Sequence, residues 1–204
     1  TNTKYMTEQK NNKYIVFLNL PLHIRNKVDQ VSEKFNKKHA NEWPSHITIK
    51  YDGKYSIPEE RIIKIFSTFF KALPVQNLIL DAPRIDFMKD YDGWNINLPI
   101  DNESLRSTVK QFSALIEPYI NKDAPGALDS TIWEQSKNFS LHISIKGGLQ
   151  RQAVEKLYQE VLHENFDLNF PTKILCTSVT LARWVDNKWE EVSVVQLLKN
   201  NEAP

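Results

Sequence analysis

The sequence is short of three things: cysteine, long apolar runs and net charge. Cys176 is the only cysteine, so an intramolecular disulfide cannot form and a cysteine-rich zinc site is excluded. It lies within ILCTSVTL, a run typical of a buried strand, which favours a packed thiol over a nucleophile. We see no signal-peptide pattern and no apolar stretch long enough to cross a bilayer in the 204 residues given. These absences predict a reducing, cytoplasmic location and no membrane partner.

The charge balance limits the kind of partner. Lysine and arginine number 26 against 25 aspartates and glutamates, a formal net charge of +1. Proteins that hold long nucleic acids by their phosphates are usually strongly basic. We therefore expect no long nucleic acid but a small nucleotide or short oligonucleotide bound in one local pocket. The 204 residues suffice for one sizeable domain or two small lobes that share a core, and we expect a monomer.

One five-residue phrase occurs twice. HITIK covers residues 46–50, and HISIK covers residues 142–146, which is 96 residues later (142 − 46). The tripeptide Asn-Leu-Pro also occurs twice, at 19–21 and 97–99, and similar strand and helix patterns surround both copies. The second copy is longer before its histidine, and residues 121–139 are the expected insertion. Two copies of one unit commonly pack about a pseudo-two-fold axis.

Strand geometry predicts how the repeated phrase presents its side chains. Alternate residues of a strand share a face, so the two isoleucines of each phrase should point into the core. The other face then carries an imidazole, a hydroxyl and an ammonium group in one row. The side chains predicted on this face are those of His46, Thr48, Lys50, His142, Ser144 and Lys146.

Two facing rows of this kind suit phosphoryl transfer between oxygen atoms. One neutral imidazole can take a proton from the attacking oxygen while the other, protonated, gives one to the leaving oxygen. Histidine is the side chain whose ordinary pKa lets both forms coexist near neutral pH. The hydroxyls can donate hydrogen bonds to the non-bridging phosphate oxygens.

His46-Ile47-Thr48-Ile49 and His142-Ile143-Ser144-Ile145 resemble the paired His-x-Thr/Ser-x motifs of the 2H phosphoesterase superfamily, also called the LigT-like or 2′,5′ RNA ligase-like family. The resemblance covers roughly residues 13–198. It implies an α+β fold of two pseudo-symmetric lobes, each an antiparallel sheet with flanking helices, around a central cleft. Departures are the serine in the second motif, Leu141 where proline is common, and the insertion.

We therefore expect a single two-lobed domain over residues 13–198, with an inserted loop at 121–139, between a flexible tail at 1–12 and a second tail at 199–204.

The resemblance also implies metal-independent phosphodiester chemistry with no cofactor. His46 and His142 become the acid–base pair, and Thr48 and Ser144 the phosphate binders. Which histidine is the acid stays open. The substrate also stays open between 2′,3′-cyclic phosphates, 2′-5′-linked oligoadenylates, RNA 3′ ends and cyclic nucleotides. A metal ion held by the two histidines is disfavoured, because no carboxylate or third histidine stands at a supporting spacing.

Three further residues are candidates for substrate binding. Lys50 and Lys146 could neutralise a phosphate, although a lysine at a strand end often points into water. Trp133, in the inserted loop, could stack on a base or could pin the loop to the core.

The sequence leaves three rivals to a small phosphodiesterase. The first is a nucleotide- or RNA-end-binding module without turnover, and the second is a phosphodiesterase of cyclic oligonucleotides. The third is a catalytic domain of a longer polypeptide.

Overall fold

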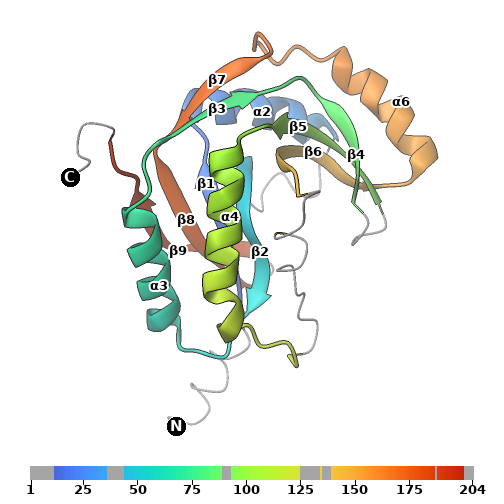
Figure 1. Ribbon diagram of the computed structural model, residues 1–204. Coiled ribbons are helices and arrows are strands. Elements are labelled where there is room, and N and C mark those ends of the chain that lie inside the picture. The colour runs from blue at the N-terminus through green and yellow to red at the C-terminus, as the bar shows by residue number, and fades with distance from the viewer. Residues whose placement is uncertain are drawn as a thin grey trace.

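The computed structural model describes residues 12–35, 44–88, 93–124, 134, 139–186 and 188–199, and within them two antiparallel sheets carry the helices (Figure 1). The elements in chain order are β1 (Lys13–Asn19), α2 (Leu22–Phe35), β2 (His46–Lys54), α3 (Glu59–Lys71), β3 (Gln76–Leu80), β4 (Arg84–Met88), β5 (Gly93–Ile100), α4 (Glu103–Ile116), the short 3-10 helix η2 (Glu117–Tyr119), β6 (Leu141–Leu149), α6 (Arg151–Leu162), β7 (Thr172–Cys176), β8 (Ser178–Val185) and β9 (Lys188–Gln196).

The two sheets have matching strand orders. The first sheet runs β2-β1-β8-β9, with β2 at one edge. In the second sheet β6 lies at the edge beside β5, and β3 and β4 follow one another along the other side of β5. Pro83, which has no backbone N–H to donate, lies in the short break between β3 and β4. β7 pairs with β3 and closes the sheet.

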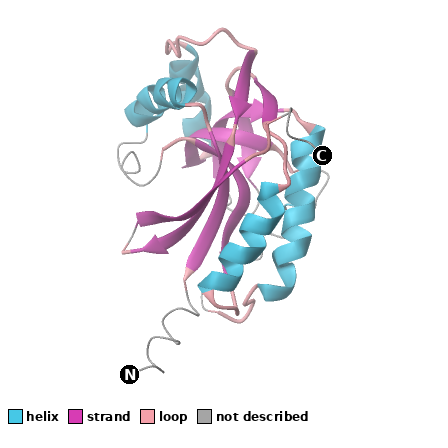
Figure 2. Cartoon of the chain, turned by 90° about the vertical axis from the view of Figure 1, so that its left-hand side faces the viewer, coloured by secondary structure: helices cyan, strands magenta, loops and turns pink. Residues whose placement is uncertain are grey.

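The helices are exchanged between the two sheets. α2 follows β1 of the first sheet but packs against β6 of the second, and α4 follows β5 of the second sheet but packs against β2 of the first. α3 covers β8 and β9, and α6 covers β4 and β5. Figures 1 and 2 show α3 and α4 side by side on one face of the first sheet. Each lobe therefore depends on a helix supplied by the other copy of the unit.

Aromatic and aliphatic stripes explain why the helices pack where they do. In α3 the buried residues Ile62, Phe66 and Phe70 recur every four positions, which places them on one face. Phe112 of α4 packs against the rings of Phe69 and Phe70, with ring centroids 5.2 and 4.8 Å apart. Asn102 caps α4 by accepting a hydrogen bond from the backbone N–H of Leu105.

The strand registers establish the internal symmetry and correct one expectation. Asn19 pairs with His46 in the first sheet, whereas Pro99 pairs with His142 in the second. The structural repeat in β1 and β5 is thus 80 residues (99 − 19). Equating the two Asn-Leu-Pro tripeptides, which are 78 residues apart (97 − 19), was wrong: the position that matches Asn97 is Phe17.

The buried side chains of both sheets and all four covering helices form one hydrophobic cluster. The predicted fold class, α+β with two lobes that are each an antiparallel sheet with flanking helices, is confirmed. None of the helices in the described part of the chain is long and apolar enough to span a lipid bilayer.

Candidate active site

The two predicted histidines lie on the edge strands where the sheets meet. His46 begins β2, His142 is the second residue of β6, and these two strands contact one another. The isoleucines of both phrases are buried, with exposed fractions of 0–1%, whereas both imidazoles are partly exposed. The predicted alternation therefore holds for the first four residues of each phrase.

Both imidazoles are held in the same way. Nδ1 of His46 lies 2.9 Å from the carbonyl oxygen of Pro44, and Nδ1 of His142 lies 3.0 Å from that of Ser140. A carbonyl oxygen can only accept, so Nδ1 of each ring carries the proton and donates it. In the neutral ring Nε2 is then the acceptor, which is the nitrogen that a general base needs.

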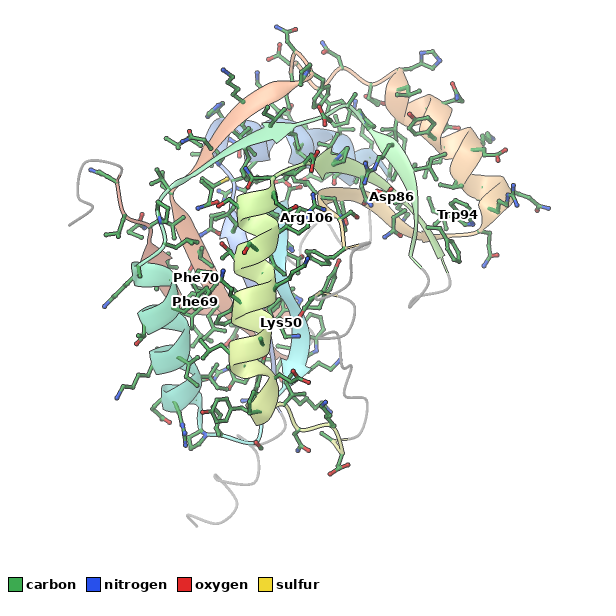
Figure 3. The ribbon with its side chains drawn as sticks, in the orientation of Figure 1. Lys50, Phe69, Phe70, Asp86, Trp94 and Arg106 are labelled. Atoms are coloured by element: carbon green, nitrogen blue, oxygen red, sulfur yellow. The ribbon has the colours of Figure 1, made fainter. Side chains whose placement is uncertain are left out.

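Helices of matching position hold the chain just before each histidine. In α2 the Asp29 carboxylate accepts the backbone N–H of Ser45 at 2.8 Å. In α4 the Arg106 guanidinium, labelled in Figure 3, donates to the carbonyl oxygen of Phe139 at 2.9 Å. These contacts fix where each motif strand begins, and therefore where each imidazole stands.

Burial and neighbouring charges shift the pKa values of both imidazoles. Burial lowers the pKa of both histidines below the ordinary value, and the hydrogen bond to the carbonyl opposes this shift in each. The charge of His142 lowers the pKa of His46 further, so His142 lies close enough for its charge to act on the His46 ring. Asp86 raises the pKa of His142 and Arg84 lowers it. The lowered pKa values favour the neutral form of both rings in the free protein.

The hydroxyls flank the imidazoles. Thr48, two residues after His46, is partly exposed and lies opposite Phe17 of β1. Ser144, two residues after His142, is exposed and lies opposite Asn97 of β5. Each hydroxyl shares the face of its histidine, as an interval of two residues requires.

The two motif strands contain matching β-bulges. Pairing slips by one residue just after each hydroxyl, so that Lys50 lies opposite Val16 and Lys146 lies opposite Ile96. A bulge adds one residue and ends the strict alternation of side chains. Lys50 and the preceding Ile49 are consequently both buried, at 0% and 1% exposure.

The predicted substrate contact of Lys50 is therefore wrong. Its Nζ lies 2.9 Å from the Glu134 carboxylate, and both side chains are almost fully buried. The Ser113 hydroxyl and the backbone N–H of Tyr51 also donate to Glu134. Figure 3 shows Lys50 beside α4, which supplies Ser113. The ammonium group stabilises the fold and cannot reach a ligand.

The remaining sequence candidates have different outcomes. Lys146 occupies the position equivalent to Lys50 but is partly exposed, so its contact with substrate stays a prediction. Trp133 lies outside the described residues. Among the described residues no group of three or more histidines, cysteines, aspartates and glutamates is placed to hold a metal ion.

Sequence reasoning missed four residues of this site and its support. Phe17 packs on the His46 ring, with centroids 4.6 Å apart. Asp86 accepts hydrogen bonds from Arg84 Nε at 2.9 Å and from Asn97 Nδ2 at 3.1 Å. Asn97 is fully buried, and its Oδ1 has no hydrogen-bond partner among the described residues. These side chains come from strands that pair with the motif strands or lie one strand further away, so no local motif marks them.

Comparison with known proteins shows the fold. No family model and no curated protein matches the sequence. The chain resembles TT0787 of Thermus thermophilus, with TM-score 0.56, 11% identity and coverage of 92% of this chain and 99% of that one. It also resembles E. coli LigT complexed with 3′-AMP, with TM-score 0.50, 11% identity and coverage of 92% of this chain and 98% of that one. Kluyveromyces marxianus Usb1 gives TM-score 0.47 and 12% identity, with coverage of 93% of this chain and 100% of that one. The chain has the LigT-like two-lobed fold.

The buried ion pair should be costly to break. Lys50→Met leaves the Glu134 carboxylate buried without its cation and should lower the free energy of unfolding by about 3–5 kcal/mol. The double substitution Lys50→Met with Glu134→Leu should recover much of that loss, because no buried charge remains unpaired. Urea unfolding followed by circular dichroism measures both.

Lys188→Met is the matched control, because Lys188 and Glu190 form an exposed pair at 3.6 Å. It should cost no more than about 1 kcal/mol. If Lys50→Met cost as little as this control, the role assigned to the buried pair would be wrong.

Proposed function

We propose that this chain is a metal-independent phosphodiesterase that acts on a small RNA-derived phosphodiester, a 2′,3′-cyclic phosphate or a 2′-5′-linked oligoadenylate. The observation that carries the proposal is the matched pair of imidazoles. Each stands on an edge strand at an equivalent position, donates Nδ1–H to the carbonyl two residues earlier, and has a hydroxyl two residues later.

The chemistry follows from this pairing. With a 2′,3′-cyclic phosphate, Nε2 of one neutral histidine takes a proton from water as the water oxygen attacks phosphorus. The bond to the 3′ oxygen breaks, and the other histidine, protonated, gives that oxygen its proton. The product is a 2′-phosphate, and proton exchange with solvent restores the two histidines. With a 2′-5′ linkage, the adjacent 3′-hydroxyl attacks instead, the 5′ oxygen leaves, and a cyclic phosphate is the product.

The surroundings fit an anionic substrate. Both histidines have lowered pKa values in the free protein because the surrounding protein removes them from much of the solvent. A bound phosphodiester brings a negative charge close to them, which favours protonation of one ring. The site thus acquires its acid when substrate binds. Thr48 and Ser144 supply hydrogen-bond donors for the non-bridging oxygens, where charge must be stabilised in the transition state.

The comparison supports the substrate class at a coarse level. LigT, which has the same fold, has been solved in complex with 3′-AMP, a nucleoside phosphate. A near-zero net charge also agrees with a small substrate rather than a long nucleic acid. We infer a nucleotide or short oligonucleotide as the ligand and a cytoplasmic, monomeric protein as its setting.

The direct test is a substrate panel with EDTA present. It comprises 2′,3′-cyclic mononucleotides, 2′-5′ oligoadenylate, 3′-5′-linked oligonucleotides and cyclic oligonucleotides. We expect turnover that resists the chelator, and a loss of about 10²-fold to 10⁴-fold in kcat in both His46→Ala and His142→Ala.

His23→Ala is the control, because His23 is an exposed histidine of α2 outside the site. It should keep full activity. Ligand binding that survives His46→Ala, with no product from any phosphodiester, would identify a binding module and refute the proposed hydrolase.

The pH dependence follows from the lowered pKa values. The active form has one neutral and one protonated histidine, and it predominates between the two apparent pKa values of the pair. Both histidines have pKa values below the ordinary 6.5. The profile of kcat/KM should therefore be bell-shaped, with its maximum below pH 6.5 and a fall as the pH rises through 7. A flat profile between about pH 5 and 8 would contradict paired acid–base catalysis.

A further inference from the structure

The second lobe carries a charged residue, Arg84, at a strand position where the first lobe has Thr180. Ser144 of β6 lies opposite Asn97 of β5, and Asn97 lies opposite Arg84 of β4. Residues that pair directly in an antiparallel sheet project from the same face. Ser144, Asn97 and Arg84 therefore form a row across three strands, on the face that also carries His142.

The Arg84 guanidinium is held through its Nε, and its two terminal amino groups face away from that contact. Its Nε donates to both oxygens of Asp86, at 2.9 and 3.1 Å. The two terminal amino groups have no partner among the described residues, and the side chain is 47% exposed. Figure 3 shows Asp86 among β4, β5 and β6. These two amino groups form the fork with which an arginine binds two phosphate oxygens at once. In Arg84 the fork is oriented by Asp86 and accessible.

The guanidinium lies within reach of the reacting groups electrostatically. Its charge lowers the pKa of His142, while the charge of Asp86 raises it. Arg84 and Ser144 are two strands apart, which is about 9.5 Å between backbones. A long arginine side chain closes part of this gap. The fork is therefore placed to contact a group of the substrate that lies beside a phosphate bound at Ser144.

In the described part of the first lobe, the matching row carries no charge. This row is Thr48, Phe17 and Thr180. Asn19 donates to the hydroxyls of Ser178 and Thr180, both at 2.9 Å, and the Phe17 ring packs on His46, so these strand residues beside His46 are uncharged. Asp29 of α2, which raises the pKa of His46, adds a negative charge on this side. Of the two rows that the structure describes, the one with Arg84 is therefore the one that attracts a second anionic group of the substrate.

We propose that Arg84 binds a second phosphate group of the substrate, carried by the nucleoside whose 2′ oxygen bears the scissile phosphate. The preferred substrate is then a 5′-phosphorylated oligonucleotide rather than a nucleoside with a single cyclic phosphate. Asp86 is the positioning residue of this subsite. The inference rests on the proposed function, because the scissile phosphate must lie beside Ser144.

The kinetic test compares a 2′-5′-linked adenosine dimer with the same dimer carrying a 5′-phosphate. The wild type should prefer the phosphorylated dimer. Arg84→Gln should lower the ratio of kcat/KM for the phosphorylated dimer to kcat/KM for the unphosphorylated dimer by about tenfold to a hundredfold, the range for a lost charge-assisted hydrogen bond. The ratio is the readout because loss of the Arg84 charge also acts on His142, and that effect is common to both dimers. Arg84→Lys should restore part of the preference, because it keeps the charge without the fork.

The matched control is Arg61→Gln, an exposed arginine on α3 that stacks on Tyr119. This variant should leave kcat/KM unchanged for both dimers. If Arg84→Gln slowed both dimers equally, Arg84 would act on the scissile phosphate or on the fold, and the subsite would be refuted. No effect on either dimer would refute it as well.

A binding arm separates this inference from the proposed function. Calorimetry with adenosine 2′-monophosphate and adenosine 2′,5′-bisphosphate should show tighter binding of the bisphosphate by wild type, and the difference should vanish in Arg84→Gln. That result without turnover of any phosphodiester would retain the subsite and refute the hydrolase. Turnover without any preference for the second phosphate, in kinetics or binding, would do the reverse.

Discussion

The contact between two edge strands is the constraint on which the site depends. β2 and β6 lie at the edges of different sheets and touch without pairing into one. Each histidine stands at the start of its strand, so the separation of the imidazoles is set by how the sheets meet. That junction is secured by the exchanged helices: α2 packs on β6, and α4 packs on β2. Neither lobe can complete its core alone, because each borrows a helix from the other half of the chain.

Duplication has preserved the backbone of the two motif strands more faithfully than their surroundings. Both strands bulge at the same place, after the hydroxyl residue. The lysine of the repeated Ile-Lys dipeptide is nevertheless exposed to a different extent in the two copies. Lys50 is buried against Glu134, which comes from the segment before the second motif. Lys146, at the equivalent position, is partly exposed. A buried cation needs a charged partner, and Glu134 supplies it in the first copy.

The parts predictable from sequence were those governed by local rules. Alternation along a strand correctly placed His46, Thr48, His142 and Ser144, because these residues precede the bulges. The same rule failed at Lys50, where the bulge reverses the side chain's direction. No local pattern announces such a bulge, and no spacing announces Glu134, which lies 83 residues from the backbone amide that it binds.

The prediction that the two Asn-Leu-Pro tripeptides are equivalent failed for a related reason. The two tripeptides look equivalent in the sequence, but strand pairing sets the repeat at 80 residues, so Asn97 corresponds to Phe17. Identity of letters is weaker evidence than register, because a strand's neighbours decide which side chains meet. The partners of Asn97 were hidden in the same way: Asp86 lies on β4, and only the pairing of β4 with β5 brings the two together.

A symmetric frame poses a problem for the proposed acid–base catalysis, because that mechanism requires two similarly held imidazoles to act in opposite protonation states. The motif strands cannot supply the difference, since each fixes its ring through the same Nδ1–carbonyl hydrogen bond. The difference comes from the strand two places away. β8 offers the hydroxyls of Ser178 and Thr180 to Asn19, whereas β4 offers the charged pair Arg84 and Asp86. The strands beside β1 and β5 therefore differ in charge, and this difference makes the surroundings of the two imidazoles unequal.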